Sequence, residues 1–137
     1  MKKSFPKKTM LNREHGQSLV ETALVLPILI LILCGIIDFG WLFTNQLMIN
    51  NSSREAARAG IVNYEDNNAA YQTLVINKAK EMVFFGNVPN VTVTVNADET
   101  EVTVLVEDTV PILTPIVGAF YSNNQAKLTS STTMRIG

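Results

Sequence analysis

The sequence has few histidines and cysteines, which many catalytic sites and metal centres use. Its 137 residues include one histidine, His15, and one cysteine, Cys34. No glycine-rich phosphate loop and no regular spacing of metal ligands occurs. A lone cysteine also has no partner for a disulfide within the chain. We therefore expect a protein that is not an enzyme and that has no cofactor or metal site.

Acidic side chains gather in one region, but they do not have the spacing of a calcium loop. The group consists of Asp98, Glu99, Glu101, Glu107 and Asp108. A dedicated calcium loop needs Asp, Asn and Gly at fixed positions, and that order is missing here. We therefore expect these carboxylates to be solvated.

The sequence does contain one long apolar run. Residues Leu19 to Phe43 are interrupted by charge only at Glu21 and Asp38. A helix of this length rises about 38 Å at about 1.5 Å per residue, which is enough to cross a bilayer. Because backbone groups in lipid must be satisfied within the segment, we expect a transmembrane helix with a bend at Pro27. Asp38 lies near the outer end, where we expect it to be solvated at the interface.

Charge is distributed unevenly about this run. Before Gly16 the only acid is Glu14, against Lys2, Lys3, Lys7, Lys8 and Arg13, whereas the side chains beyond Gly16 carry a net charge of −5. The positive-inside bias predicts a cytoplasmic N-terminus and an extracytoplasmic C-terminal part. We read the basic cluster as a topology signal of a bilayer protein and expect no nucleic-acid partner. Residues up to His15 have no apolar period, and we expect them to lack regular structure.

The apolar run passes directly into a helix that leaves the membrane. Residues 45–62 contain no proline, and their one glycine is Gly60. Small residues there, Ala56, Ala57 and Ala59 beside Gly60, permit another element to approach closely. That element is either the chain's own sheet, which we favour, or a helix of another subunit.

A polar linker at residues 63–68 separates this helix from a second, amphipathic one. Apolar side chains recur at helical spacing from about Ala69 to Phe85, namely at Tyr71, Leu74, Val75, Met82 and Phe85. Gly86, Asn87 and Pro89 then predict its end.

From Val91 onward the apolar period changes from helical to two, which predicts strands. A hairpin with a turn at Asp98 and Glu99, or a longer loop, sets Val91, Val93 and Val95 opposite Val106, Val104 and Val102. All six valines then share one face, and the helix over residues 69–85 is the nearest cover. A third, antiparallel strand is expected over residues 128–136.

The segment between these strands is apolar but interrupted by Pro111 and Pro115. We expect it to be irregular or briefly helical. Its apolar residues either close an open end of the core or mark a surface for a partner or the membrane. The fold class is therefore α+β: a leader (1–16), a transmembrane helix with its extension (17–62), and a small extracytoplasmic domain with a helix packed on a three-stranded antiparallel sheet (63–137).

The start of the apolar run resembles a prepilin signal. In such signals a membrane peptidase cuts after a glycine, and the mature chain has a glutamate at its fifth position. The resemblance implies cleavage between Gly16 and Gln17, and an assembly role for Glu21. In pilin-like proteins this glutamate pairs with a free N-terminal amine. The alternative is that Glu21 snorkels to the interface and stabilises the positive helix N-terminus.

A wider resemblance covers residues 16–60. The run GQSLVETALVLPILILILCGIIDFGWLF, followed by SSREAARAG, resembles the TadE-like family of tight-adherence (Tad) pilus systems. That resemblance implies a minor pseudopilin of the bacterial cell membrane, needed for pilus assembly and adherence. The implied partners are a prepilin peptidase, sibling pilins or pseudopilins and the Tad assembly platform. The alternative is a permanently anchored extracytoplasmic module that binds a cell-wall polymer or a secreted protein.

Overall fold

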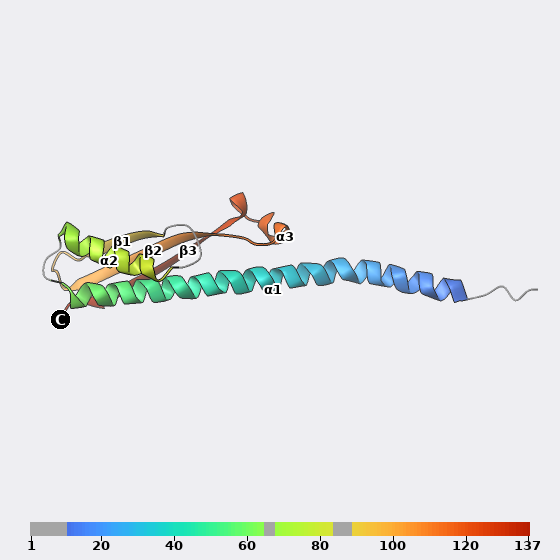
Figure 1. Cartoon of the computed structure of the whole chain (residues 1–137), viewed down its shortest axis with the longest axis horizontal. Coiled ribbons are helices and arrows are strands. Elements are labelled where there is room, and N and C mark those ends of the chain that lie inside the picture. The colour runs from blue at the N-terminus through green and yellow to red at the C-terminus, as the bar shows by residue number, and fades with distance from the viewer. Residues whose placement is uncertain (1–10, 65–67, 84–88) are drawn as a thin grey trace, which may run out of the picture.

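The molecule is one long helix with a small sheet packed along its second half (Figure 1). The computed structural model describes residues 11–64, 68–83 and 89–137. Helix α1 spans Leu11–Val62, and α2 spans Ala69–Glu81. The strands are β1 (Asn90–Val95), β2 (Glu101–Pro111) and β3 (Gln125–Arg135), with the short helices α3 (Pro115–Gly118) and η1 (Ser122–Asn124) between β2 and β3. The predicted α+β class is confirmed.

Helix α1 starts earlier than the sequence pattern predicted. We expected no regular structure before Gly16, but α1 begins at Leu11. The residues between these two positions include neither proline nor glycine, so nothing in them stops the helix from extending backwards. Residues 1–10, the rest of the basic leader, lie outside the described residues.

Over its 52 residues α1 rises about 78 Å. It continues through Pro27, which lies inside the helix and removes one backbone hydrogen bond. The helix changes direction gently in its blue-to-cyan part (Figure 1), which contains this proline. The predicted bend is therefore present, and it does not interrupt the helix.

The sheet is antiparallel with the strand order β1-β2-β3. Val91, Val93 and Val95 pair with Val106, Val104 and Val102, which confirms the predicted register of the hairpin. The turn is the longer of the two alternatives, because the last hairpin bond runs from the Asn96 amide to the Glu101 carbonyl at 3.0 Å. Strand β3 pairs along the other edge of β2, with Glu101 opposite Arg135.

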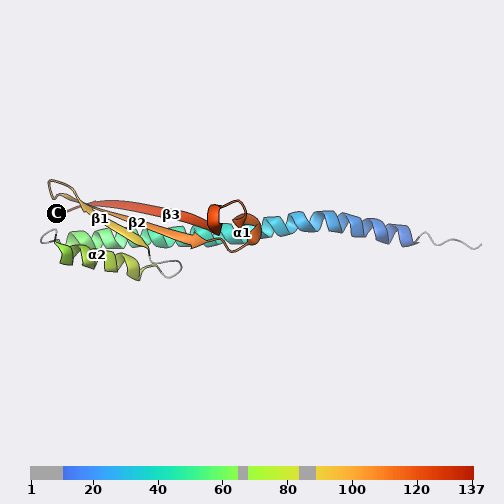
Figure 2. The same ribbon diagram turned by 90° about the horizontal axis from the view of Figure 1, so that it is seen from above.

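The core lies between the valine face of the sheet and the second half of α1. Val102, Val104 and Val106 are fully buried, as is Ile49 of α1. Helix α1 packs against β2 and β3, whereas α2 packs beside it and contacts β1 (Figure 2). The second helix, which we expected as the nearest cover, therefore contacts the sheet at β1. The extension of α1 covers most of the face because its small residues let the sheet lie close.

The small residues of α1 contact the chain's own sheet and second helix. Ala56 and Ala57 are fully buried. The Ser52 hydroxyl donates to the Ala79 carbonyl of α2 at 2.7 Å. A Cβ at Gly60 would lie 3.0 Å from the Tyr71 hydroxyl oxygen, so the glycine makes room for the close approach of α1 and α2. The favoured, intramolecular alternative is confirmed.

Helix α2 is shorter than predicted. The Asn68 side chain caps its N-terminus by accepting from the Tyr71 amide, and the helix ends at Glu81 rather than at Phe85. The Met82 amide donates to the Ala79 carbonyl and the Val83 amide donates to the Lys80 carbonyl, which tightens and closes the last turn. Phe85, Gly86 and Asn87, part of the predicted end, lie outside the described residues.

Candidate functional site

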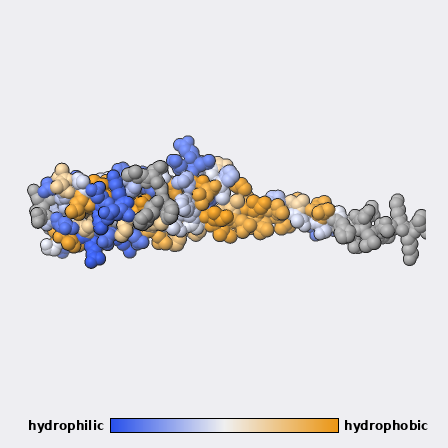
Figure 3. Space-filling model, viewed as in Figure 1, coloured by the Kyte–Doolittle hydropathy of each residue, from blue (hydrophilic) through white to orange (hydrophobic). Residues whose placement is uncertain are grey.

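The first half of α1 projects beyond the domain with no cover. All residues from Gly16 to Leu33 are exposed. The helix contains one segment long and apolar enough to cross a membrane, and no part of its most apolar window is buried within the molecule. The apolar surface forms a continuous band along this part of α1 (Figure 3). These properties indicate a single-pass membrane anchor.

Glu21 is the only charged residue between Gly16 and Ile37. Its side chain is exposed on this uncovered part of α1, residues 16–33, which we call the bare helix. It lies beside a shallow apolar depression lined by Thr22, Val25, Leu26 and Leu29. Transfer of a charged carboxylate into the middle of a bilayer costs about 3 kcal/mol, and less near the interface. A cationic partner would offset that cost, and the exposed position leaves Glu21 open to one from another molecule.

The two residues of the predicted cleavage site, Gly16 and Gln17, are also exposed, and both lie within α1. A Cβ placed on Gly16 would meet no atom within 4 Å. The site is thus sterically open. Because it is helical, a peptidase that binds substrates in an extended conformation has to unwind this turn.

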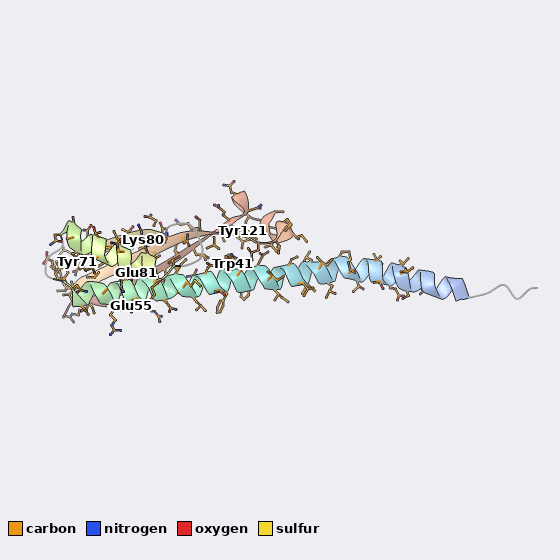
Figure 4. All side chains as sticks on the ribbon, in the orientation of Figure 1. Trp41, Glu55, Tyr71, Lys80, Glu81 and Tyr121 are labelled. Atoms are coloured by element: carbon orange, nitrogen blue, oxygen red, sulfur yellow. The ribbon has the colours of Figure 1, made fainter. Side chains whose placement is uncertain are left out.

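Asp38 is not solvated as expected but buried, with 2 % of its surface exposed. Its carboxylate accepts hydrogen bonds from the amides of Leu113 (2.9 Å) and Thr114 (3.1 Å), and from the Thr114 hydroxyl. One turn further along, the Trp41 indole N–H donates to the Pro111 carbonyl at 3.1 Å. Figure 4 shows Trp41 on the side of α1 that faces the segment after β2. Asp38 and Trp41 therefore tie that segment to α1.

The expectation for the acidic group was wrong at Asp108. Its side chain is 4 % exposed because it follows Val106 on the inward face of β2. Burial raises the pKa of its carboxyl, and the hydrogen bond from the Thr109 amide opposes that shift. Among the described residues its Oδ2 atom has no hydrogen-bond partner.

Glu107, the neighbour of Asp108, points to the opposite face and pairs with Lys127 at 2.7 Å. The hydrogen bond and charge of Lys127 lower the pKa of the Glu107 carboxyl. In the parts of the chain that the structure describes, no three His, Cys, Asp or Glu side chains come together in a way that could hold a metal ion.

The segment after β2 keeps much of its apolar surface outside the core. Ile112 is buried and closes the end of the core, as one of the two alternatives predicted. Leu113, Ile116, Phe120 and Tyr121 are instead 53, 38, 84 and 45 % exposed, respectively. These four side chains do not close the core, and the other alternative, a surface for a partner or for the membrane, stays a prediction for them.

A comparison of the sequence with protein-family models finds a match in the N-terminal part of the chain. Residues 16–58 match the model of the family described as TadE-like protein. No curated protein and no solved structure matches the chain. The matched segment contains the bare helix, Glu21, the tie at Asp38 and most of the extension that packs on the sheet. The match confirms the resemblance inferred from the sequence: the chain has a TadE-like region over residues 16–58, which indicates a component associated with Tad pili.

Proposed function

We propose that this chain is a pseudopilin-like subunit of a Tad-type pilus, needed for pilus assembly and adherence. Its N-terminus lies in the cytoplasm, its α1 crosses the cell membrane, and its sheet domain lies outside. A prepilin peptidase removes the leader after Gly16, so that Gln17 becomes the first residue. The TadE-like region and the uneven charge about the span support this arrangement.

The proposal rests on the exposed carboxylate of Glu21, which is the only charged side chain of α1 between Gly16 and Ile37. After cleavage at Gly16, the new amine of Gln17 lies about 6 Å along the helix axis from Glu21, at about 1.5 Å per residue. In a helix bundle, the amine of one subunit can therefore meet the glutamate of a neighbour at a similar depth in the membrane. The pair offsets the cost of placing each charge in lipid.

The remaining surface of α1 fits the same role. Residues from Leu19 to Leu33 present large apolar side chains on all sides, so sibling helices can replace lipid around the span without leaving apolar surface in water. The sheet domain packs its own core against residues 45–60, so it does not need a partner to be folded. Assembly therefore uses the bare helix, and the domain is carried with it.

Mass spectrometry of the protein from cells with an active prepilin peptidase tests the processing step. We expect a mature chain that begins at Gln17, and a Gly16→Leu variant that keeps its leader. A wild-type chain that still begins at Met1 in such cells would refute cleavage.

Pilus counts by electron microscopy, with immunoblots for protein level, test the role of Glu21. We expect Glu21→Ala to abolish or strongly reduce piliation at an unchanged protein level. Thr22→Ala, a matched change in the same depression, should leave it normal. Normal piliation and adherence with Glu21→Ala would instead support a permanently anchored module that binds a cell-wall polymer or a secreted protein.

A further inference from the structure

The segment that joins β2 to β3, residues 112–124, is hydrogen-bonded to α1 although it has little regular structure. Asp38 fixes its beginning through Leu113 and Thr114. The Ile112 amide donates to the Asn124 carbonyl at 2.9 Å and closes the base of the loop. Gly118 lies against Asn124, because a Cβ there would approach the Asn124 side-chain oxygen to 2.8 Å. We call residues 112–124 the capping loop.

The two acids of the apolar run, Glu21 and Asp38, indicate where the capping loop lies relative to the bilayer. Glu21 and Asp38 are 17 residues apart, or about 26 Å along the axis, compared with about 30 Å for the hydrocarbon core. A bilayer centred between them extends from about residue 20 to about residue 39. Because Asp38 holds the capping loop, a bilayer placed in this way has the loop at the outer boundary of its hydrocarbon core.

The capping loop presents apolar side chains at this boundary. Ile116, Phe120 and Tyr121 are exposed, with Phe120 the most exposed at 84 %. Helix α3 packs against α1. Cys34 and Gly35, which directly follow the bare helix, are the first residues of the span to be partly covered. They lie about one turn to the membrane side of Asp38. The exposed apolar side chains of the loop therefore lie next to the outer end of the apolar span.

We propose that the capping loop is a second membrane contact, which inserts Phe120 and its apolar neighbours into the interfacial region of the outer leaflet. Continuity with the span favours lipid over a protein as the occupant, because the loop is held at the height of the headgroups in every copy of the chain. Tyr121 and Trp41 are of the residue types that are enriched at that depth. Partial burial of a large aromatic side chain in lipid removes its apolar surface from water.

The arrangement also explains why an acid is tolerated at position 38. The capping loop supplies two amides and a hydroxyl to the Asp38 carboxylate, so the charge is hydrogen-bonded within the protein rather than exposed to lipid. The same bonds set the depth of Phe120. The contact requires the membrane anchor, but it is independent of leader cleavage and pilus assembly.

The test uses the full chain in phosphatidylethanolamine/phosphatidylglycerol vesicles with nitroxide-labelled lipids. Trp41 is the only tryptophan and serves as a native probe. A Cys34→Ala background carries one environment-sensitive fluorophore at Phe120→Cys, at Leu29→Cys in the span, or at Ala97→Cys on the hairpin. Phe120 and Ala97 are both exposed in the folded domain, so the two labels form a matched pair.

We expect shallow nitroxides to quench Trp41 and the Phe120 probe at least threefold more than the Ala97 probe, and deep nitroxides to quench the Leu29 probe most. Equal iodide access to the Phe120 and Ala97 probes, with Leu29 deeply quenched, would overturn the loop contact but leave the anchor intact. Unquenched Leu29 would overturn both. A Phe120 probe shielded only when a sibling pilin is added would assign the surface to a protein and overturn the lipid contact.

Discussion

Replacing Asp38 by alanine should detach the capping loop from α1 while leaving the sheet folded. The carboxylate is the acceptor for the Leu113 and Thr114 amides and for the Thr114 hydroxyl. Alanine provides no acceptor, so all three donors lose their partner at once. The valine core lies further along α1, from Ile49 onward, and Asp38 is not part of it.

The size of the effect follows from the hydrogen bonds. A bond to a charged group contributes about 1.5–3 kcal/mol, and a donor left without a partner costs about 1–3 kcal/mol. Because the three bonds share one acceptor and are partly open to solvent, we take about 3 kcal/mol for the set. That lowers the free energy of loop opening enough to speed amide exchange about 150-fold, since about 1.4 kcal/mol is tenfold. Asp38→Asn keeps one acceptor oxygen and should give about tenfold.

Hydrogen exchange measured by mass spectrometry on the full chain in lipid nanodiscs reads the loop and the sheet separately. Peptides that contain residues 113 and 114 should lose protection in Asp38→Ala, whereas peptides from β1 and β2 should not change. Asp98→Ala, which removes an exposed acid from the hairpin, is the control. Unaltered exchange of the loop in Asp38→Ala would show that the carboxylate does not hold the loop.

Two further predictions concern the domain. Gly60→Val should destabilise it by about 1–3 kcal/mol, because the added side chain meets the Tyr71 hydroxyl. Chemical denaturation in detergent measures this, and the exposed Arg58→Val change supplies the same β-branched residue without the clash. Asp108→Asn should raise the melting temperature at pH 7 and have little effect near pH 3. Since burial raises the pKa of Asp108 in the folded state, the wild type loses stability as the pH rises from about 3.9 through the raised value. An equal effect of Asp108→Asn at both pH values would contradict this.

The strand register was predictable because the alternation of six valines admits one pairing that buries them all. A shift of one residue would move three of them to the other face, so Val95 has to face Val102. The position of the apolar run and the spacing from Gly16 to Glu21 are also local features. Such features can be read without knowing which distant segments meet.

The predictions that were wrong either depended on distant contacts or overlooked which face of a strand a residue lies on. Nothing near Asp38 indicates that Thr114, 76 residues away, supplies its hydrogen bonds. Asp108 is different, because the same alternation that places Val106 and Val110 inward also places the residue between them inward. That signal was present in the sequence. The small residues of α1 indicate that the sheet can approach closely, but how the two helices share the face of the sheet depends on contacts between distant segments.

The continuity of α1 links the membrane part to the domain mechanically. Between Trp41 and Ala59 the helix contains neither glycine nor proline, and the sheet packs along this stretch, so this part of α1 and the domain form one unit. In the proposed pilus, movement of the span out of the bilayer therefore lifts the domain by the same distance. The hydrogen bonds of Asp38 join two parts that move together and persist, whereas the contact of Phe120 with lipid is broken. Extraction from the membrane then has to overcome burial of the capping loop as well as burial of the helix.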